Sequence, residues 1–206
     1  MKPSEVGQGY DEIAHIWSGD SFNRLNGIKQ HDRALAFCQN RHRALDIGCG
    51  SSGRIIDLLL GAGFEVEGLD ISGRMIELAS ERHPKVRFHQ ADICEWTFPY
   101  RYDFISAWDS IWHVPLTAHE SVMERMLEHL TPGGVCIFSM GGLDREEEKT
   151  DSVMGPRMYY STPGIPRTLE LVTRKRCTLR HMEFDQPGEH HVYMIVQRAW
   201  AATGSQ

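Results

Sequence analysis

The chain has 206 residues, 41% of them hydrophobic and 24% charged, and a formal net charge of −6. This length suits one globular domain with an N-terminal extension, and the apolar fraction is sufficient for a full core. The negative charge disfavours a general nucleic-acid binder, which needs basic side chains against phosphates. One basic run, 174–176, is a candidate RNA contact, although a solvated turn ahead of a strand is the preferred interpretation.

The five cysteines are widely spaced, odd in number and without a C-x-x-C pair. That pattern argues against a disulfide framework and a tetrahedral zinc site, and for a reducing compartment. The first residues lack the apolar core of a signal peptide, and no apolar stretch is long enough to span a membrane. We therefore expect a cytoplasmic protein with no membrane partner.

Helical segments come first in the chain, at 9–19 and 22–38, and their aromatic residues indicate packing on the body of the protein. After residue 40, short apolar runs alternate with helical stretches, a pattern typical of βαβ units and a parallel sheet. The expected strands are 43–47, 64–69, 86–89, 102–108 and 135–140, and the expected helices are 52–60, 72–80 and 117–130.

Two further strands are expected near the C-terminus, at 177–184 and 191–198. The link between them is so short that they must run antiparallel. The charged stretch 143–151 is the candidate mobile loop, although a solvated connector is the preferred interpretation. The domain prediction is a helical N-terminal segment over 1–40, one α/β domain over 41–200 and a flexible tail over 201–206.

A glycine-rich turn follows the first expected strand. Gly48, Gly50 and Gly53 complete a G-x-G-x-x-G pattern, and glycines there let the backbone turn sharply and approach a ligand closely. Asp70 ends the next strand, where a carboxylate accepts hydrogen bonds from both ribose hydroxyls. These features indicate an adenosine-containing cofactor, but they do not separate NAD from S-adenosylmethionine.

Asp46 lies two residues before the first glycine and separates these two cofactors. NAD would bring a doubly negative pyrophosphate to this turn, and an aspartate there would repel it. S-adenosylmethionine carries no phosphate but has an ammonium and a sulfonium group, and Asp46 suits the ammonium. The aspartate therefore favours S-adenosylmethionine.

Five segments resemble the motifs of the class I S-adenosylmethionine-dependent methyltransferases, in the order and spacing of that family. They are residues 45–50, 68–72, 90–93, 102–105 and 130–134. The resemblance implies an α/β, Rossmann-like, doubly wound sheet of seven strands in the order 3-2-1-4-5-7-6, with strand seven antiparallel. Residues 10–14 resemble the start of small-molecule methyltransferases, which implies that the N-terminal helices form a lid over the cofactor.

The resemblance also implies the cofactor contacts. Asp70 would bind the ribose, and Asp92 the adenine amino group, with Ile93 beside the ring; for Asp92 a turn cap is the alternative, and for Met75 plain packing. The expected cofactor-binding residues are Asp46, Gly48, Cys49, Gly50, Asp70, Ile71, Met75, Asp92, Ile93 and Trp108, with Tyr10, Trp17 and Arg24 from the lid.

The methyl acceptor should meet the cofactor after the fourth strand, over residues 107–115. Methyl transfer is an in-line displacement, so proximity and orientation supply much of the catalysis, and a base helps only where the acceptor carries a proton of high pKa. His113 is the candidate base, with a structural role as the alternative. The expected acceptor contacts are Trp112, Tyr159, Tyr160 and His190, and His191, Arg157 and Arg167 are further candidates. Asp109 has no companion acidic pair, so we expect no metal.

The leading hypothesis is a methyltransferase, monomeric or homodimeric, that acts on an O, N or C atom of a small molecule. An RNA or protein methyltransferase, an NAD-dependent oxidoreductase and a non-catalytic S-adenosylmethionine-binding protein are the alternatives. A basic stripe around Arg174 would favour the first of these, and an occluded acceptor pocket the last. Asp46 and the lack of room for a second substrate domain disfavour the oxidoreductase.

Overall fold

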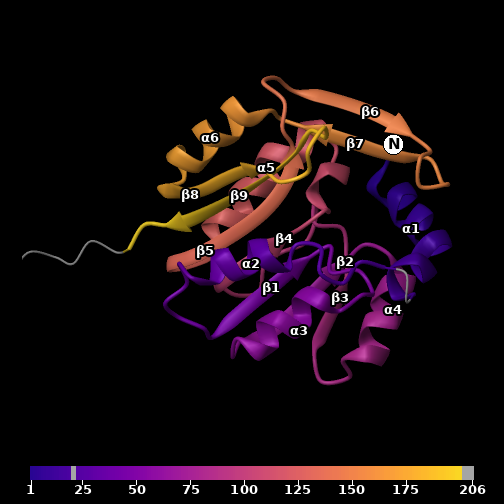
Figure 1. Cartoon of the computed structure of the whole chain (residues 1–206), viewed down its shortest axis with the longest axis horizontal. Coiled ribbons are helices and arrows are strands. Elements are labelled where there is room, and N and C mark those ends of the chain that lie inside the picture. Colours follow the sequence, from indigo (N-terminus) through magenta and orange to yellow (C-terminus); the bar gives the residue numbers. More distant parts are fainter. Residues whose placement is uncertain (20–21, 201–206) are drawn as a thin grey trace, which may run out of the picture.

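The computed structural model describes residues 1–19 and 22–200, and a seven-stranded sheet forms its centre (Figure 1). Its strands are β1 (Arg43–Ile47), β2 (Glu65–Asp70), β3 (Arg87–Gln90), β4 (Tyr102–Ala107), β5 (Leu130–Gly141), β8 (Cys177–Phe184) and β9 (His191–Arg198). Their order is β3-β2-β1-β4-β5-β9-β8. Strands β1 to β5 pair in parallel, whereas β9 runs antiparallel to both of its neighbours. The predicted strand order and the antiparallel seventh strand are confirmed, since β8 and β9 are the sixth and seventh strands of this sheet in chain order.

Helices cover both faces of the sheet. They are α1 (Pro3–Ser18), α2 (Ile28–Leu35), α3 (Arg54–Gly61), α4 (Gly73–Arg82), α5 (Leu116–Glu128) and α6 (Ile165–Arg174), with a short 3-10 turn η1 (Ile111–His113) after β4. Apolar side chains of α2, α3 and α4 pack in one core layer, and those of α5 and α6 pack in the other. Because both faces are covered, every residue of β4 is buried, as expected for a central parallel strand.

The N-terminal helices differ from the prediction. Helix α1 begins at Pro3 rather than at residue 9, with proline in its first turn and the Glu5 carboxylate accepting the Lys2 N–H. The expected helix over 22–38 is only α2, because Gly27 adopts a left-handed φ of 81° immediately before it. A side chain at Gly27 would collide with the Trp108 ring, so this glycine lets the chain pass close to β4.

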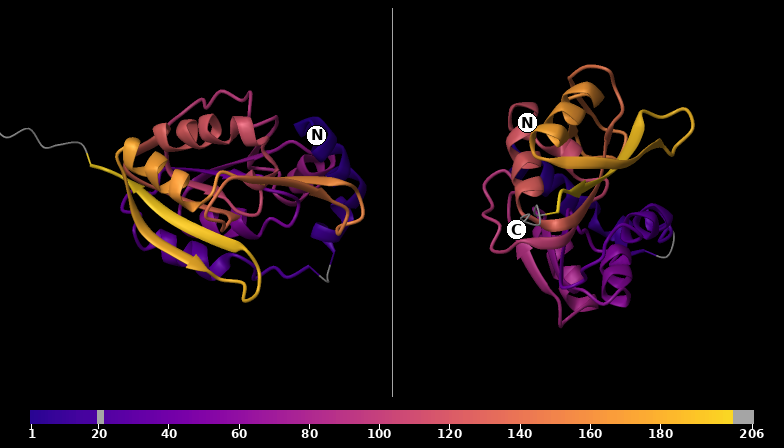
Figure 2. Two further views of the ribbon diagram at one scale, coloured as in Figure 1. Left: turned by 90° about the horizontal axis from the view of Figure 1, so that it is seen from above. Right: turned by 90° about the vertical axis from the view of Figure 1, so that its left-hand side faces the viewer.

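The predicted connector at 143–151 is partly a strand. Strand β6 (Glu147–Asp151) pairs antiparallel with β7 (Met158–Thr162), and α6 follows. Nearly all of β6 is exposed on both faces, so its sequence has no apolar alternation from which a strand could be recognised. The β6–β7 hairpin and α1 lie at the same end of the molecule in Figure 1 and in the left-hand view of Figure 2.

The predicted tail, 201–206, lies outside the described residues. Among residues 1–19 and 22–200, no helix has the length and apolar character needed to cross a bilayer.

Candidate cofactor and acceptor site

A cavity of about 140 Å³ opens at the carboxyl ends of β1, β2 and β4, beneath α1. We call it the inner cavity. It is the position at which doubly wound sheets bind ligands. Its lining includes every expected cofactor-binding residue except Asp46 and Arg24: Gly48, Cys49, Gly50, Asp70, Ile71, Met75, Asp92, Ile93, Trp108, Tyr10 and Trp17.

The glycine turn is fixed against β2. The N–H groups of Gly48 and Cys49 both donate to the Leu69 carbonyl, at 2.7 and 3.1 Å. Gly48 has a φ of 70°, and a Cβ there would collide with Cβ of Ser110. Only glycine therefore fits between β1 and the segment after β4.

Asp70 presents its carboxylate to the inner cavity from the end of β2. One oxygen accepts the N–H of Gly50 and the other that of Ser72, each at 2.9 Å. Burial raises the pKa of this carboxyl group, and those two hydrogen bonds oppose the rise. Each oxygen keeps further lone pairs, so the carboxylate can also accept two hydroxyl groups from a ligand.

Asp92 caps a turn and Met75 packs in the core, and both also line the inner cavity. One Asp92 oxygen accepts the N–H of Cys94 at 2.8 Å, which is a turn cap, and the residue also lines the inner cavity. Met75 is 2% exposed and packs in α4, while it too contributes to the lining.

His113 connects α1 to the β6–β7 hairpin. Its Nδ1 lies 2.6 Å from the Tyr159 carbonyl, which can only accept, so Nδ1 carries the proton. Its Nε2 lies 2.8 Å from the Tyr10 hydroxyl and 3.0 Å from the Trp112 indole nitrogen. Burial lowers the His113 pKa to about 4, so the ring is neutral at pH 7. The lone pair of Nε2 accepts hydrogen bonds from Tyr10 and Trp112. A histidine whose lone pair is occupied in this way fits a structural role better than the role of a base.

A second cavity, of about 320 Å³, lies between the β6–β7 hairpin and the β8–β9 turn. We call it the outer cavity. Three of the expected acceptor contacts, Trp112, Tyr160 and His190, line it, as does His191. The Trp112 ring lies 6.2 Å from the ring of His113, which lines the inner cavity, and 5.6 Å from that of His191. Trp112 of the outer cavity lining thus contacts His113 of the inner cavity lining.

The remaining acceptor candidates line neither cavity. The Tyr159 hydroxyl donates to Glu148 and accepts the Leu116 N–H. Arg157 donates to Thr150, and Arg167 pairs with Glu120 and Glu146.

Two expected cofactor residues lie outside the inner cavity lining. Arg24 is half-exposed, donates to the Ser52 carbonyl at 2.9 Å and lies 3.6 Å from Asp57. Asp46 is 2% exposed, and burial raises its pKa to about 7, although the Ser106 hydroxyl and Arg54 favour its charged form. The ligand-facing role expected for Asp46 is not supported by its position in β1.

Two polar residues in the inner cavity lining, Asn26 and Arg54, were not foreseen, and Asp109 was considered only as a possible metal ligand. The Arg54 guanidinium donates to the Asn26 carbonyl at 2.8 Å and to the Ser52 hydroxyl at 2.9 Å. The only sequence feature that could have indicated Arg54 as a cavity residue is its position directly after Gly53, the last glycine of the turn. Asp109 follows β4 and has a left-handed φ of 52°, a conformation that no sequence pattern predicted.

The comparisons with known proteins agree with this geometry. A family model described as "Methyltransferase domain" matches residues 44–134, the segment that holds β1 to β4, the glycine turn and Asp70. Residues 44–134 are thus similar to a methyltransferase domain.

Curated relatives of the methyltransferase domain act on different molecules. Trans-aconitate 2-methyltransferase of Delftia acidovorans is 36% identical over 58% of this chain, and 27-O-demethylrifamycin SV methyltransferase of Amycolatopsis mediterranei is 28% identical over 73%. This chain spans 44% and 66% of the length of these two relatives.

Solved structures share the fold across nearly the whole chain. The 1,6-didemethyltoxoflavin-N1-methyltransferase of Burkholderia thailandensis, with bound 1,6-didemethyltoxoflavin and S-adenosylhomocysteine, superposes with a TM-score of 0.72 at 19% identity, over 96% of this chain and 87% of that one. Magnesium protoporphyrin IX methyltransferase of Synechocystis with S-adenosylhomocysteine gives 0.74 at 14% identity, over 96% and 100%. At these identities the likeness shows the fold of the methyltransferase domain alone.

Proposed function

We propose that the protein transfers a methyl group from S-adenosylmethionine to a small molecule. The observation that carries this proposal is the Asp70 carboxylate, which faces the inner cavity beside the glycine turn with lone pairs free on both oxygens. When bound, S-adenosylmethionine would supply an electrophilic methyl group on a sulfonium ion. The residues of the chain would bind and orient the two reactants.

The polar residues of the inner cavity suit the parts of this cofactor. Asp70 would accept the ribose hydroxyls, and Asp92 the adenine amino group through its uncapped oxygen. Arg54 suits the carboxylate of the methionine portion, because its guanidinium is largely buried and bonds the described residues through two of its three nitrogens. The Asp109 carboxylate, on the same cavity wall, is of the sign that suits cationic groups.

NAD fits this lining less well. Its pyrophosphate would lie near the Asp109 carboxylate, and Arg54 already interacts with that charge. Calorimetry tests the choice: S-adenosylmethionine and S-adenosylhomocysteine should bind, and NAD should not. Binding of NAD without either of the other two would refute the proposal.

We further propose that the methyl acceptor occupies the outer cavity, against Trp112 and Tyr160. The presence of this cavity favours an enzyme over a non-catalytic cofactor-binding protein. Relatives named for trans-aconitate and demethylrifamycin make a small-molecule acceptor the preferred class.

An RNA acceptor is less well supported by the basic run 174–176. Arg174 pairs with Glu120 and Glu124, and Lys175 pairs with Glu124 and Glu128 on the neighbouring α5. Carboxylates therefore offset the positive charge that phosphates would require.

All five cysteines are free thiols, which supports the reducing, cytoplasmic location expected from their spacing.

A further inference from the structure

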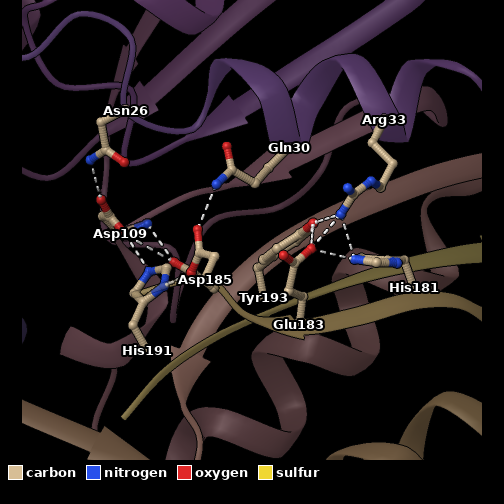
Figure 3. Close-up of polar contacts among 10 residues, drawn as sticks. Asn26, Gln30, Arg33, Asp109, His181, Glu183, Asp185, His191 and Tyr193 are labelled. Carbon is tan, nitrogen blue, oxygen red and sulfur yellow. Dashed lines mark hydrogen bonds and ion pairs between the residues drawn. The ribbon is translucent and has the colours of Figure 1, made fainter. Parts of the chain in front are cut away.

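Asp109 lies where the two cavities adjoin. Its side chain is 25% exposed and contributes to the inner cavity. Its hydrogen-bond partner His191 contributes to the outer cavity, with Nε2 of His191 3.0 Å from the Asp109 carboxylate (Figure 3). The linings of the two cavities are thus joined here by a hydrogen bond.

Several donors hold the Asp109 carboxylate in one orientation. One oxygen accepts from His191 and from the Ser139 hydroxyl at 3.2 Å, and the other accepts from the Asn26 amide at 3.0 Å. The Asp109 N–H donates to the same Ser139 hydroxyl at 2.8 Å and so secures the left-handed backbone at this residue. All three side-chain donors favour the charged form of the carboxylate.

His191 lies between two carboxylates. Its second ring nitrogen is 2.5 Å from Asp185, whose other oxygen accepts from Gln30 at 2.6 Å (Figure 3). Only a doubly protonated imidazolium can donate to both carboxylates. Burial disfavours that charge, but Asp109 and Asp185 together raise the His191 pKa. For Asp109, burial is outweighed by His191, Asn26 and Arg54, which lower the pKa of the carboxyl group.

Asp109 therefore presents an ionised carboxylate to the inner cavity at its border with the outer cavity. S-adenosylmethionine has a net charge of +1 at pH 7, whereas its demethylated product is neutral overall, and the difference is the sulfonium. We propose that Asp109, positioned by His191, faces the sulfonium and makes the protein bind the methyl donor in preference to the spent product. This inference rests on the proposed function, because it assigns a specificity role within the same site.

The test is the ratio of two dissociation constants, measured by calorimetry in the absence of methyl acceptor. In Asp109→Asn, the Kd of S-adenosylmethionine should rise relative to that of S-adenosylhomocysteine by about tenfold, since one nearby charge is lost. Asparagine keeps the shape of the side chain and tolerates a left-handed φ. A ratio that stays within twofold of the wild-type value would overturn the inference. Asp109 would then contact a portion of the molecule that S-adenosylmethionine and S-adenosylhomocysteine have in common, and not the sulfonium.

Asp185→Asn is the matched control. It neutralises the other carboxylate bonded to His191, but Asp185 does not line the inner cavity, so the ratio should stay within about twofold of wild type. An equal shift in both variants would contradict a local role for Asp109. If neither ligand binds the wild-type protein, the proposed function itself fails.

A second measurement needs no variant and covers the case in which Asp109→Asn does not fold. Sinefungin carries a protonated amine in place of the sulfonium, and it should bind the wild-type protein about tenfold more tightly than S-adenosylhomocysteine. Equal or weaker binding of sinefungin would overturn the inference.

Discussion

The Tyr10 hydroxyl donates a hydrogen bond to Nε2 of His113, at 2.8 Å and across 103 residues of sequence. The His113 proton is on the other nitrogen, where it bonds the Tyr159 carbonyl. Through these two hydrogen bonds His113 connects α1 to β7 above the inner cavity. We infer that it holds α1 in the position where Tyr10 and Trp17 cover the cofactor.

Tyr10→Phe should weaken the binding of S-adenosylhomocysteine about fivefold, the equivalent of one hydrogen bond of ~1 kcal/mol. The aromatic packing against Trp17 is retained, so the thermal midpoint should change little. Calorimetry measures the affinity. Tyr100→Phe removes a hydroxyl from a tyrosine that lines neither cavity and should leave the affinity unchanged. Equal affinities of wild type and Tyr10→Phe would contradict the inferred role of the Tyr10–His113 hydrogen bond.

Asp46→Asn should stabilise the protein without cofactor, and more so at higher pH. The folded-state pKa of about 7 is above the ordinary value of 3.8, so Asp46 costs no stability below pH 4 and an increasing amount as the pH rises to 7. Asparagine resembles the protonated form and avoids that cost. We expect a gain of roughly 2–4 kcal/mol at pH 8 and of about 1 kcal/mol or less at pH 4.5. Urea unfolding at both pH values measures it, and a gain independent of pH would show that Asp46 is already neutral or paired.

Gly48→Ala should destabilise the protein by about 1–3 kcal/mol, because the added Cβ meets Ser110 and the backbone keeps a φ of 70°. Gly61→Ala is the control: that glycine ends α3, and no atom lies within 4 Å of the position that an added Cβ would take. The control should be neutral or gain up to ~1 kcal/mol from helix propensity. Equal effects of the two substitutions in urea unfolding would mean that the turn at Gly48 can relax.

The parts of the site that are local in sequence could be predicted from it. The glycine turn and Asp70 are such cases, because a strand, a tight turn and the end of the next strand fix their positions whatever surrounds them. The C-terminal strands β8 and β9 have the predicted bounds for the same reason, since a short link leaves only one way to pair them.

The parts that depend on distant contacts could not be predicted. Asp109 and His191 are 82 residues apart, and they meet because β4 and β9 both flank β5 and because Asp109 takes a left-handed conformation. Asp46 fits the expected motif in sequence, yet it is buried in β1 and lines neither cavity. In β6, exposure of both faces removed the alternation from which a strand is recognised.

Transfer of label from methyl-tritiated S-adenosylmethionine tests the central claim most directly. The purified protein is incubated with separate small-molecule, RNA and protein fractions of a cell extract, and Asp70→Asn serves as the control that lacks a full ribose contact. We predict labelled product in the small-molecule fraction, and little or none with Asp70→Asn. Label in RNA or protein alone, or no transfer by a protein that binds the cofactor, would contradict the proposed function.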